Sequence, residues 1–164
     1  MRIFSAYSLS EKTKEELGKI ISELKKNFPD LRWVKKNNLH LTIKFYGDTT
    51  DIKTAKEQTL HLNKELGSFS FKINRLSHFN EKIVFADCIL PNISYRKIRD
   101  INNTFKPHIT LARVKKYTPT TQISGLIKVL SNINLDINEH NLKAFLFESK
   151  LSNTGPIYKK ISKL

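Results

Sequence analysis

Apolar and polar residues alternate in several short stretches of this chain, a pattern typical of β-strands with one buried face. The clearest stretch runs from Leu39 to Phe45. Strict alternation places His40 and Thr42 on one face of this strand and Phe45 on the opposite face, in the core. Similar alternation predicts further strands at residues 2–7, 69–73, 82–87, 108–113, 133–137, 141–151 and 157–161.

Apolar residues three and four positions apart predict three amphipathic helices. The first follows Ser10, a residue type that favours the N-cap position, and ends before Pro29. The second covers Asp51–Leu66 and is closed by Gly67. The third lies around residues 123–130.

Each half of the chain therefore holds a helix and several strands, and no Gly/Ser-rich linker separates the halves. Residues Ile89–Thr104 support only a short helix. The pattern predicts an α+β fold with mostly antiparallel sheet. We expect two similar lobes within a single domain, residues 1–164.

The composition fits a folded protein with a strong positive charge. The 164 residues are 39% hydrophobic and carry 29 basic against 15 acidic side chains, a formal net charge of +14. Such a surplus attracts polyanions, and nucleic acid is the obvious candidate. Lysine far outnumbers arginine and asparagine is abundant, so a biased genome composition explains the same surplus without any ligand.

Several classes of protein are excluded or disfavoured. No stretch approaches the length of apolar residues that a transmembrane helix needs, and no signal-peptide pattern opens the chain. The single cysteine, Cys88, cannot form an internal disulfide or supply a cysteine-based zinc site. We therefore expect a cytoplasmic monomer that needs neither a metal nor a cofactor.

Two of the five histidines, His40 and His108, are followed two residues later by a threonine, Thr42 and Thr110. Residues i and i+2 of a strand share a face, about 6.6 Å apart, so each imidazole lies beside a hydroxyl. Two such strands across a cleft would suit phosphodiester chemistry, with one imidazole accepting a proton and the other donating one. Alternatively, both histidines are half-buried strand residues and the threonines reflect strand propensity.

The sequences around both motifs carry a family resemblance. Residues 32–45, RWVKKNNLHLTIKF, and residues 105–114, FKPHITLARV, resemble the paired signatures of the two-histidine (2H) phosphoesterases. Within that superfamily they look like the RNA 2′,3′-cyclic phosphodiesterases, also called 2′-5′ RNA ligases. Residues 151–158, LSNTGPIY, are similar to the C-terminal signature of the same family.

The resemblance implies a pseudo-two-fold, bilobal fold in which two mostly antiparallel sheets face each other across a central cleft, with helices outside. It implies that His40 donates a proton to the departing O3′ and that His108 accepts one from water. Thr42 and Thr110 would bind phosphate oxygens, and Arg113 would add a phosphate contact. Phe45 occupies the position of an aromatic residue near the nucleobase, although alternation predicts that it is buried.

The implied reaction is metal-independent opening of a 2′,3′-cyclic phosphate end on RNA, such as a tRNA fragment, to a 2′-phosphomonoester. Strand joining would be the reverse reaction. Two alternatives stay open: a related enzyme acting on a small cyclic nucleotide of the ADP-ribose cyclic phosphate type, and an RNA-binding module without catalysis. The segment Ile89–Thr104 is shorter than in relatives, which leaves its part in substrate binding open.

Other chemistry-bearing residues are expected to be structural. His78 and His140 are expected in turns, and Cys88 as a buried thiol. Tyr158, from the C-terminal signature, is expected to shape the wall of the cleft.

Overall fold

The computed structural model describes residues 1–153 and 155–161. Within them the chain forms four α-helices, one short 3-10 helix and nine strands. Their order is β1 Arg2–Ser8, α1 Glu11–Asn27, β2 Arg32–Trp33, η1 Lys36–Asn38, β3 His40–Asp48, α2 Ile52–Leu66, β4 Phe69–Phe79, β5 Ile83–Ile89, α3 Asn92–Ile101, β6 His108–Arg113, α4 Thr120–Ser131, β7 Asn134–Leu142, β8 Ala144–Ser152 and β9 Gly155–Lys160.

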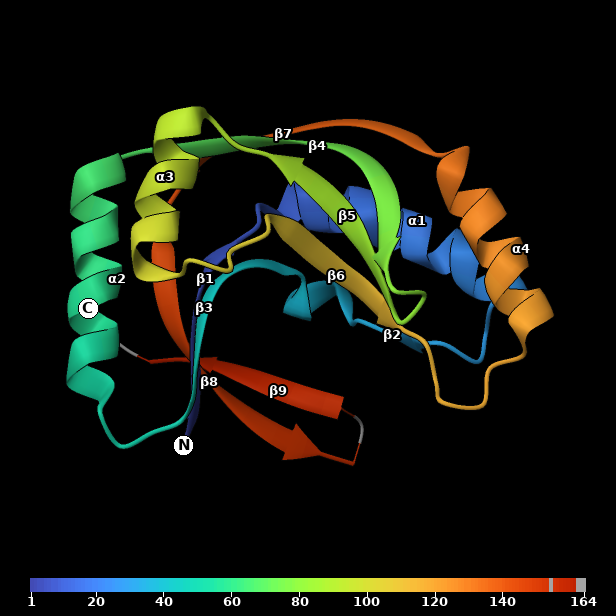
Figure 1. Cartoon of the computed structure of the whole chain (residues 1–164), viewed down its shortest axis with the longest axis horizontal. Coiled ribbons are helices and arrows are strands. Elements are labelled where there is room, and N and C mark those ends of the chain that lie inside the picture. Colours follow the sequence, from blue (N-terminus) through green and yellow to red (C-terminus); the bar gives the residue numbers. More distant parts are fainter. Residues whose placement is uncertain (154, 162–164) are drawn as a thin grey trace.

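The strands form two sheets in which all neighbours are antiparallel, so the predicted α+β architecture is confirmed. The first sheet has the order β3-β1-β8-β9 and the second the order β2-β6-β5-β4-β7. From the alternation we expected each half of the sequence to form one lobe. The lobes do not coincide with these halves. The first sheet takes two strands from each end of the chain, because pairing partners are chosen in space and not by proximity in sequence (Figure 1).

Local signals explain where the first two helices begin. Ser10 caps α1: its hydroxyl accepts the backbone N–H of Thr13 and donates to the buried carboxylate of Glu139 on β7. Asp51 caps α2 by accepting the backbone N–H of Thr54. Gly67 closes α2 with a φ of 56°, a left-handed conformation that glycine adopts without a steric penalty.

The helices cover the outer faces of the sheets. Helices α1 and α4 pack on the second sheet, whereas α2 packs on β1 and β8 of the first, with α3 beside it (Figure 1). One hydrophobic core continues from one sheet to the other. Tyr7 of β1 stacks on Phe69 of β4 with ring centroids 4.0 Å apart. This shared core holds the two lobes in a defined relation.

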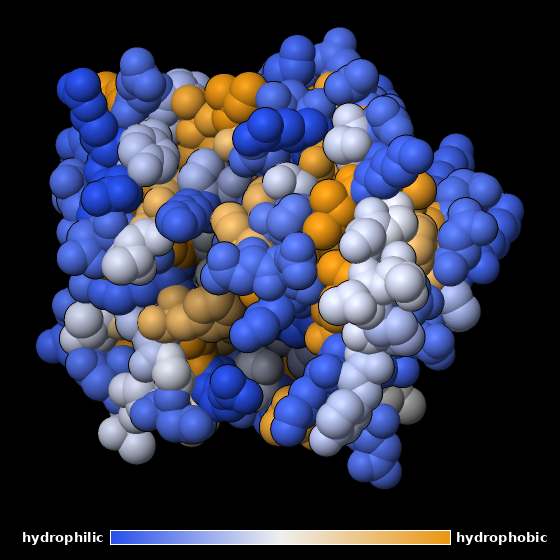
Figure 2. Space-filling view, turned by 45° about the vertical axis from the view of Figure 1, so that its right-hand side comes forward, coloured by the Kyte–Doolittle hydropathy of each residue, from blue (hydrophilic) through white to orange (hydrophobic). Residues whose placement is uncertain are grey.

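The surface is largely hydrophilic, and apolar residues appear in small patches on the face shown in Figure 2. Among the described residues, no helix is long and apolar enough to cross a membrane.

The segment Ile89–Thr104 forms the expected short helix, α3. The two-residue strand β2 was not predicted.

Candidate active site

His40 and His108 are each the first residue of a strand, β3 and β6, and these strands pack against each other across the two sheets. Burial lowers the pKa of His40, and the charge of a protonated His108 lowers it further. The structure therefore brings the two predicted histidines together.

Both imidazoles are held by the same type of hydrogen bond. Nδ1 of His40 lies 2.7 Å from the carbonyl oxygen of Asn38, and Nδ1 of His108 lies 2.7 Å from that of Lys106. A carbonyl oxygen can only accept, so each Nδ1 carries the proton and donates it. The bond fixes the ring orientation and leaves each Nε2 free to exchange a proton with a ligand.

Burial lowers the pKa of both histidines. Removal from water disfavours the charged imidazolium, and the hydrogen bond from each Nδ1 opposes this effect only in part. The guanidinium of Arg113 lowers the pKa of His108 further, whereas the carboxylate of Asp87, directly opposite on β5, raises it. The neutral form of each imidazole is therefore well populated at neutral pH.

Aromatic rings enclose each histidine. The His40 ring lies 5.0 Å from that of Phe4 and 5.2 Å from that of Tyr158, centroid to centroid. The His108 ring lies 5.0 Å from Phe79 and 5.5 Å from Phe85. These apolar walls restrict water around both imidazoles, and Tyr158 forms part of the cleft wall, as its sequence position had suggested.

Each histidine strand contains a β-bulge directly after its threonine. Along β3, Thr42 pairs with Ala6 and Lys44 with Ser5, so Ile43 between them has no partner. Along β6, the residues on either side of Leu111 pair with consecutive residues of β5, which leaves Leu111 without a partner. A bulge shifts the alternation by one residue and re-aims the side chains that follow.

The bulges decide on which side of their strands Phe45 and Arg113 lie. Phe45 does not lie in the core: its side chain is 69% exposed and lines a cavity beside Thr42. Strict alternation failed because the bulge at Ile43 changes the phase of the strand. Arg113 occupies the equivalent position of β6 and is exposed. Its guanidinium adds to the lowering of the His108 pKa that burial causes, and it opposes the rise that burial causes in the pKa of Tyr158 on the other sheet. It therefore faces the space between the lobes.

The carbonyl oxygens of Ile43 and Leu111 have hydrogen-bond partners of different kinds. The Ile43 oxygen accepts the side-chain Nδ2–H of Asn102, at 2.7 Å. The Leu111 oxygen accepts the backbone N–H of Val34, at 2.8 Å. Asn102 also accepts the backbone N–H and the hydroxyl of Thr104 through Oδ1. Asn102 therefore ties β3 to the loop that leads into β6.

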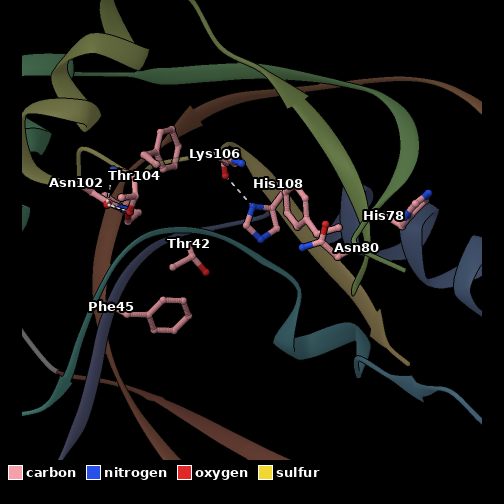
Figure 3. A pocket seen from close by; sticks show the side chains of 11 residues that line it. Thr42, Phe45, His78, Asn80, Asn102, Thr104, Lys106 and His108 are labelled. Carbon is pink, nitrogen blue, oxygen red and sulfur yellow. Dashed lines mark hydrogen bonds between the residues drawn. The ribbon is translucent and has the colours of Figure 1, made fainter. Parts of the chain in front are cut away.

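A cavity of about 460 Å³ opens at this end of the site. In Figure 3, Thr42 and Phe45 lie on one side of it and His108 on the other. It is lined by Thr42, Ile43, Phe45, His78, Phe79, Asn80, Asn102, Thr104, Phe105, Lys106 and His108. The lining does not include His40, Thr110 or Arg113, so the predicted residues extend beyond this cavity.

Several of these lining residues were not predicted from the sequence. His78 was expected in a turn but belongs to β4, where its Nδ1 accepts the backbone N–H of Glu81. Asn102 and Thr104 belong to the segment whose role in binding was left open. A polar residue at the end of a short helix was the only signal that pointed to Asn102, because the strand it contacts is distant in the sequence.

The two threonines keep their hydroxyl groups available. Thr42 and Thr110 are half-buried, and neither hydroxyl has a hydrogen-bond partner within residues 1–153 and 155–161.

Burial raises the pKa of the Cys88 thiol, which keeps it protonated and unreactive. In the part of the chain that the structure describes, no group of three or more histidine, cysteine, aspartate or glutamate side chains is placed to hold a metal ion.

Known proteins with a similar sequence cover nearly the whole chain. Residues 8–84 match the family model described as LigT like Phosphoesterase. The RNA 2′,3′-cyclic phosphodiesterase of Thermotoga maritima is 29% identical, over 97% of this chain and 92% of that protein. The protein of the same name from Methanocaldococcus jannaschii is 28% identical, over 98% of both chains.

Solved structures share the fold. TT0787 of Thermus thermophilus superposes with a TM-score of 0.75 and 21% identity, over 99% of this chain and 96% of that one. LigT of E. coli in complex with phosphate gives a TM-score of 0.71 with 20% identity, over 98% and 94% of the two chains. This chain is therefore similar in sequence to the LigT-like phosphoesterases over residues 8–84, and it shares its fold with LigT of E. coli.

Proposed function

We propose that this protein hydrolyses 2′,3′-cyclic phosphate ends of RNA to 2′-phosphomonoesters by general acid–base catalysis with His40 and His108. The observation that carries this proposal is the matched pair of imidazoles. Each donates Nδ1–H to the carbonyl oxygen two residues before it and keeps Nε2 for the cleft. This arrangement suits a reaction in which one proton is removed and another supplied.

In the proposed reaction, water attacks phosphorus while Nε2 of His108 accepts one of its protons. The bond between phosphorus and O3′ breaks, and O3′ takes the proton from Nε2 of His40. The product carries a phosphate on O2′ and a hydroxyl at C3′. Solvent then removes the proton from His108 and returns one to His40, so protons balance over the cycle.

Neighbouring side chains would bind the phosphate and the nucleoside. The free hydroxyls of Thr42 and Thr110 can donate to the non-bridging oxygens of the reacting phosphate, and Arg113 can add a contact to an RNA phosphate. Phe45, exposed at the edge of the cavity, offers a ring face on which a nucleobase can stack.

The relatives named above and the net charge of +14 support RNA as the substrate class. A small cyclic nucleotide needs no extended basic surface. We propose that RNA fragments with cyclic ends, including those of tRNA, are bound by a monomer. A 5′-hydroxyl in place of water would turn the same chemistry into reversible 2′-5′ ligation.

The test uses a short RNA ending in a 2′,3′-cyclic phosphate, incubated with purified protein in EDTA. We expect wild-type protein to form the 2′-phosphate, and His40→Ala and His108→Ala to form almost none while still binding the RNA. A 3′-phosphate product would contradict departure of O3′. RNA binding without turnover by the wild type would favour the binding module, and turnover of only an ADP-ribose cyclic phosphate would favour the small-nucleotide enzyme.

A further inference from the structure

Two arginines of adjacent strands lie directly opposite each other at one end of the second sheet. Arg32 of β2 pairs with Arg113 of β6, next to the pair formed by Trp33 and Ala112. Opposed residues of an antiparallel pair share a face, with Cβ atoms about 5 Å apart, and like charges placed in this way are destabilising. Both side chains are exposed.

Nothing in the described part of the chain neutralises this pair. Among residues 1–153 and 155–161, neither Arg32 nor Arg113 takes part in an ion pair. Other cations do have acidic partners, such as Arg75 with Asp87 at 2.9 Å. Two opposed guanidinium groups without a carboxylate between them form a site that an anion would stabilise.

The location of the pair relates it to the active site. The beginning of β6 lies near the middle of β3, where Lys106 and His108 line the cavity together with Thr42 and Phe45. The other end of β6 carries Arg113 on the same face as His108. Burial raises the pKa of Tyr158 on β9, and the Arg113 guanidinium opposes this rise. The Phe45 cavity therefore lies at the His108 end of β6, and the arginine pair lies at the other end of the same strand.

Further cations continue from the arginine pair. The backbone N–H of Val114 bonds to the carbonyl oxygen of Lys82, which brings Lys82 beside the end of β6. The exposed Lys115 and Lys116 follow directly, and the Lys116 ammonium lies 5.4 Å from the ring centre of Tyr117, which is 86% exposed. A row of cations that ends in an exposed aromatic ring fits a single-stranded nucleic acid.

We propose that Arg32 and Arg113 form a subsite for the phosphate that joins the terminal nucleotide to the rest of the RNA chain. The inference rests on the proposed function and extends it from the cyclic end to the polymer. The terminal nucleoside would occupy the Phe45 cavity, and the preceding chain would leave the cleft over the arginine pair toward Lys115 and Lys116. The guanidinium forks match phosphate oxygens, and binding would relieve the repulsion between the two charges.

The experiment compares two substrates on Arg32→Gln: a 2′,3′-cyclic mononucleotide, which lacks the second phosphate, and a trinucleotide with the same cyclic end. We expect the ratio of kcat/KM for the trinucleotide to that for the mononucleotide to fall about tenfold, as for a lost hydrogen bond between charged groups. The salt dependence of log kcat/KM for the trinucleotide should become shallower by about 0.7, since one phosphate contact is lost.

Lys128→Gln provides the matched control. It also removes one exposed positive charge, but from α4 on the outer face of the same sheet. We expect its substrate ratio to equal that of the wild type. Arg32→Lys, which keeps the charge but loses the fork, should give an intermediate ratio. The melting temperature of Arg32→Gln should stay constant or rise, because a like-charge contact is removed.

Three outcomes would overturn the subsite. Equal ratios for Arg32→Gln and Lys128→Gln would show that only net charge matters. An equal loss on both substrates would place Arg32 on the reacting phosphate instead. A loss that follows a lowered melting temperature would make Arg32 structural. If wild-type protein hydrolyses neither substrate, the proposed function itself fails, which separates the two conclusions.

Discussion

Strands β3 and β6 have the same construction up to a point and then differ. In both, the histidine comes first, its Nδ1 bonds to the carbonyl oxygen two residues earlier, a threonine follows, and a bulge follows the threonine. The bulge then turns an apolar ring, Phe45, toward the cleft on β3 and a cation, Arg113, on β6. A symmetric reaction centre is thereby given two chemically different ends, one suited to a base and one to phosphates.

The largest effect should come from the histidines, and a modified substrate can break their symmetry. A cyclic end with sulfur in place of O3′ expels a thiolate, which needs no proton from an acid. We expect each alanine variant to lose about 10²–10⁴-fold in turnover on the normal substrate. The sulfur substrate should restore turnover to His40→Ala and leave His108→Ala inactive, measured by release of the thiol. The opposite pattern would exchange the two roles.

The two re-aimed residues should respond differently to salt. Phe45→Ala is expected to raise KM about 5–150-fold, the range for loss of one stacked base, with little change in its salt dependence. Arg113→Gln should raise KM and also flatten the dependence on salt, because a phosphate contact is lost. Initial rates at several salt concentrations test both variants. Equal salt slopes would remove the distinction between the two ends of the cleft.

The partners of the bulge carbonyls predict a smaller difference. Asn102→Ala leaves the Ile43 oxygen without its donor, whereas no side-chain substitution can remove the donor of Leu111, the backbone of Val34. We expect Asn102→Ala to lower the free energy of unfolding by about 1–3 kcal/mol and to raise KM, since Phe45 and the loop before His108 lose a shared anchor.

Asn63→Ala is the matched control for Asn102. Asn63 also bonds through both side-chain atoms, to the backbone of Ala144, and neither residue lines the cavity. Urea unfolding should show a similar loss of stability for both variants, with KM changed only for Asn102→Ala. A rise in KM that matched the loss of stability in both variants would reduce Asn102 to a purely structural role.

The smallest expected effect concerns pH. Burial lowers the pKa of both histidines below the ordinary imidazole value near 6.5. The catalytic acid therefore begins to lose its proton below that pH, and kcat/KM falls as the pH rises further. Asp87→Asn removes a charge that raises the pKa of His108, and the acid limb of the profile should move to lower pH if His108 is the base. Movement of the alkaline limb would instead assign His108 as the acid.

The elements that local patterns define were well predicted. Alternation placed His40 and Thr42 on one face, Ser10 caps α1 as its residue type indicated, and α2 begins at Ile52, one residue after its predicted start at Asp51. Phe45 was misplaced because alternation carries no signal for a bulge. Asn102 was missed because the oxygen it binds lies 59 residues away in the sequence.

Local patterns were enough to define the two His-x-Thr strands and most of the helices, because strand and helix periods depend on near neighbours. Three features were settled only in three dimensions. They are the pairing of the strands, the positions at which a strand has an unpaired residue, and the side chain that donates to the carbonyl oxygen of Ile43. Those choices depend on contacts between distant segments. They direct Phe45 and Arg113 into the cleft, and place Arg32 beside Arg113, although no periodicity in the chain predicts it.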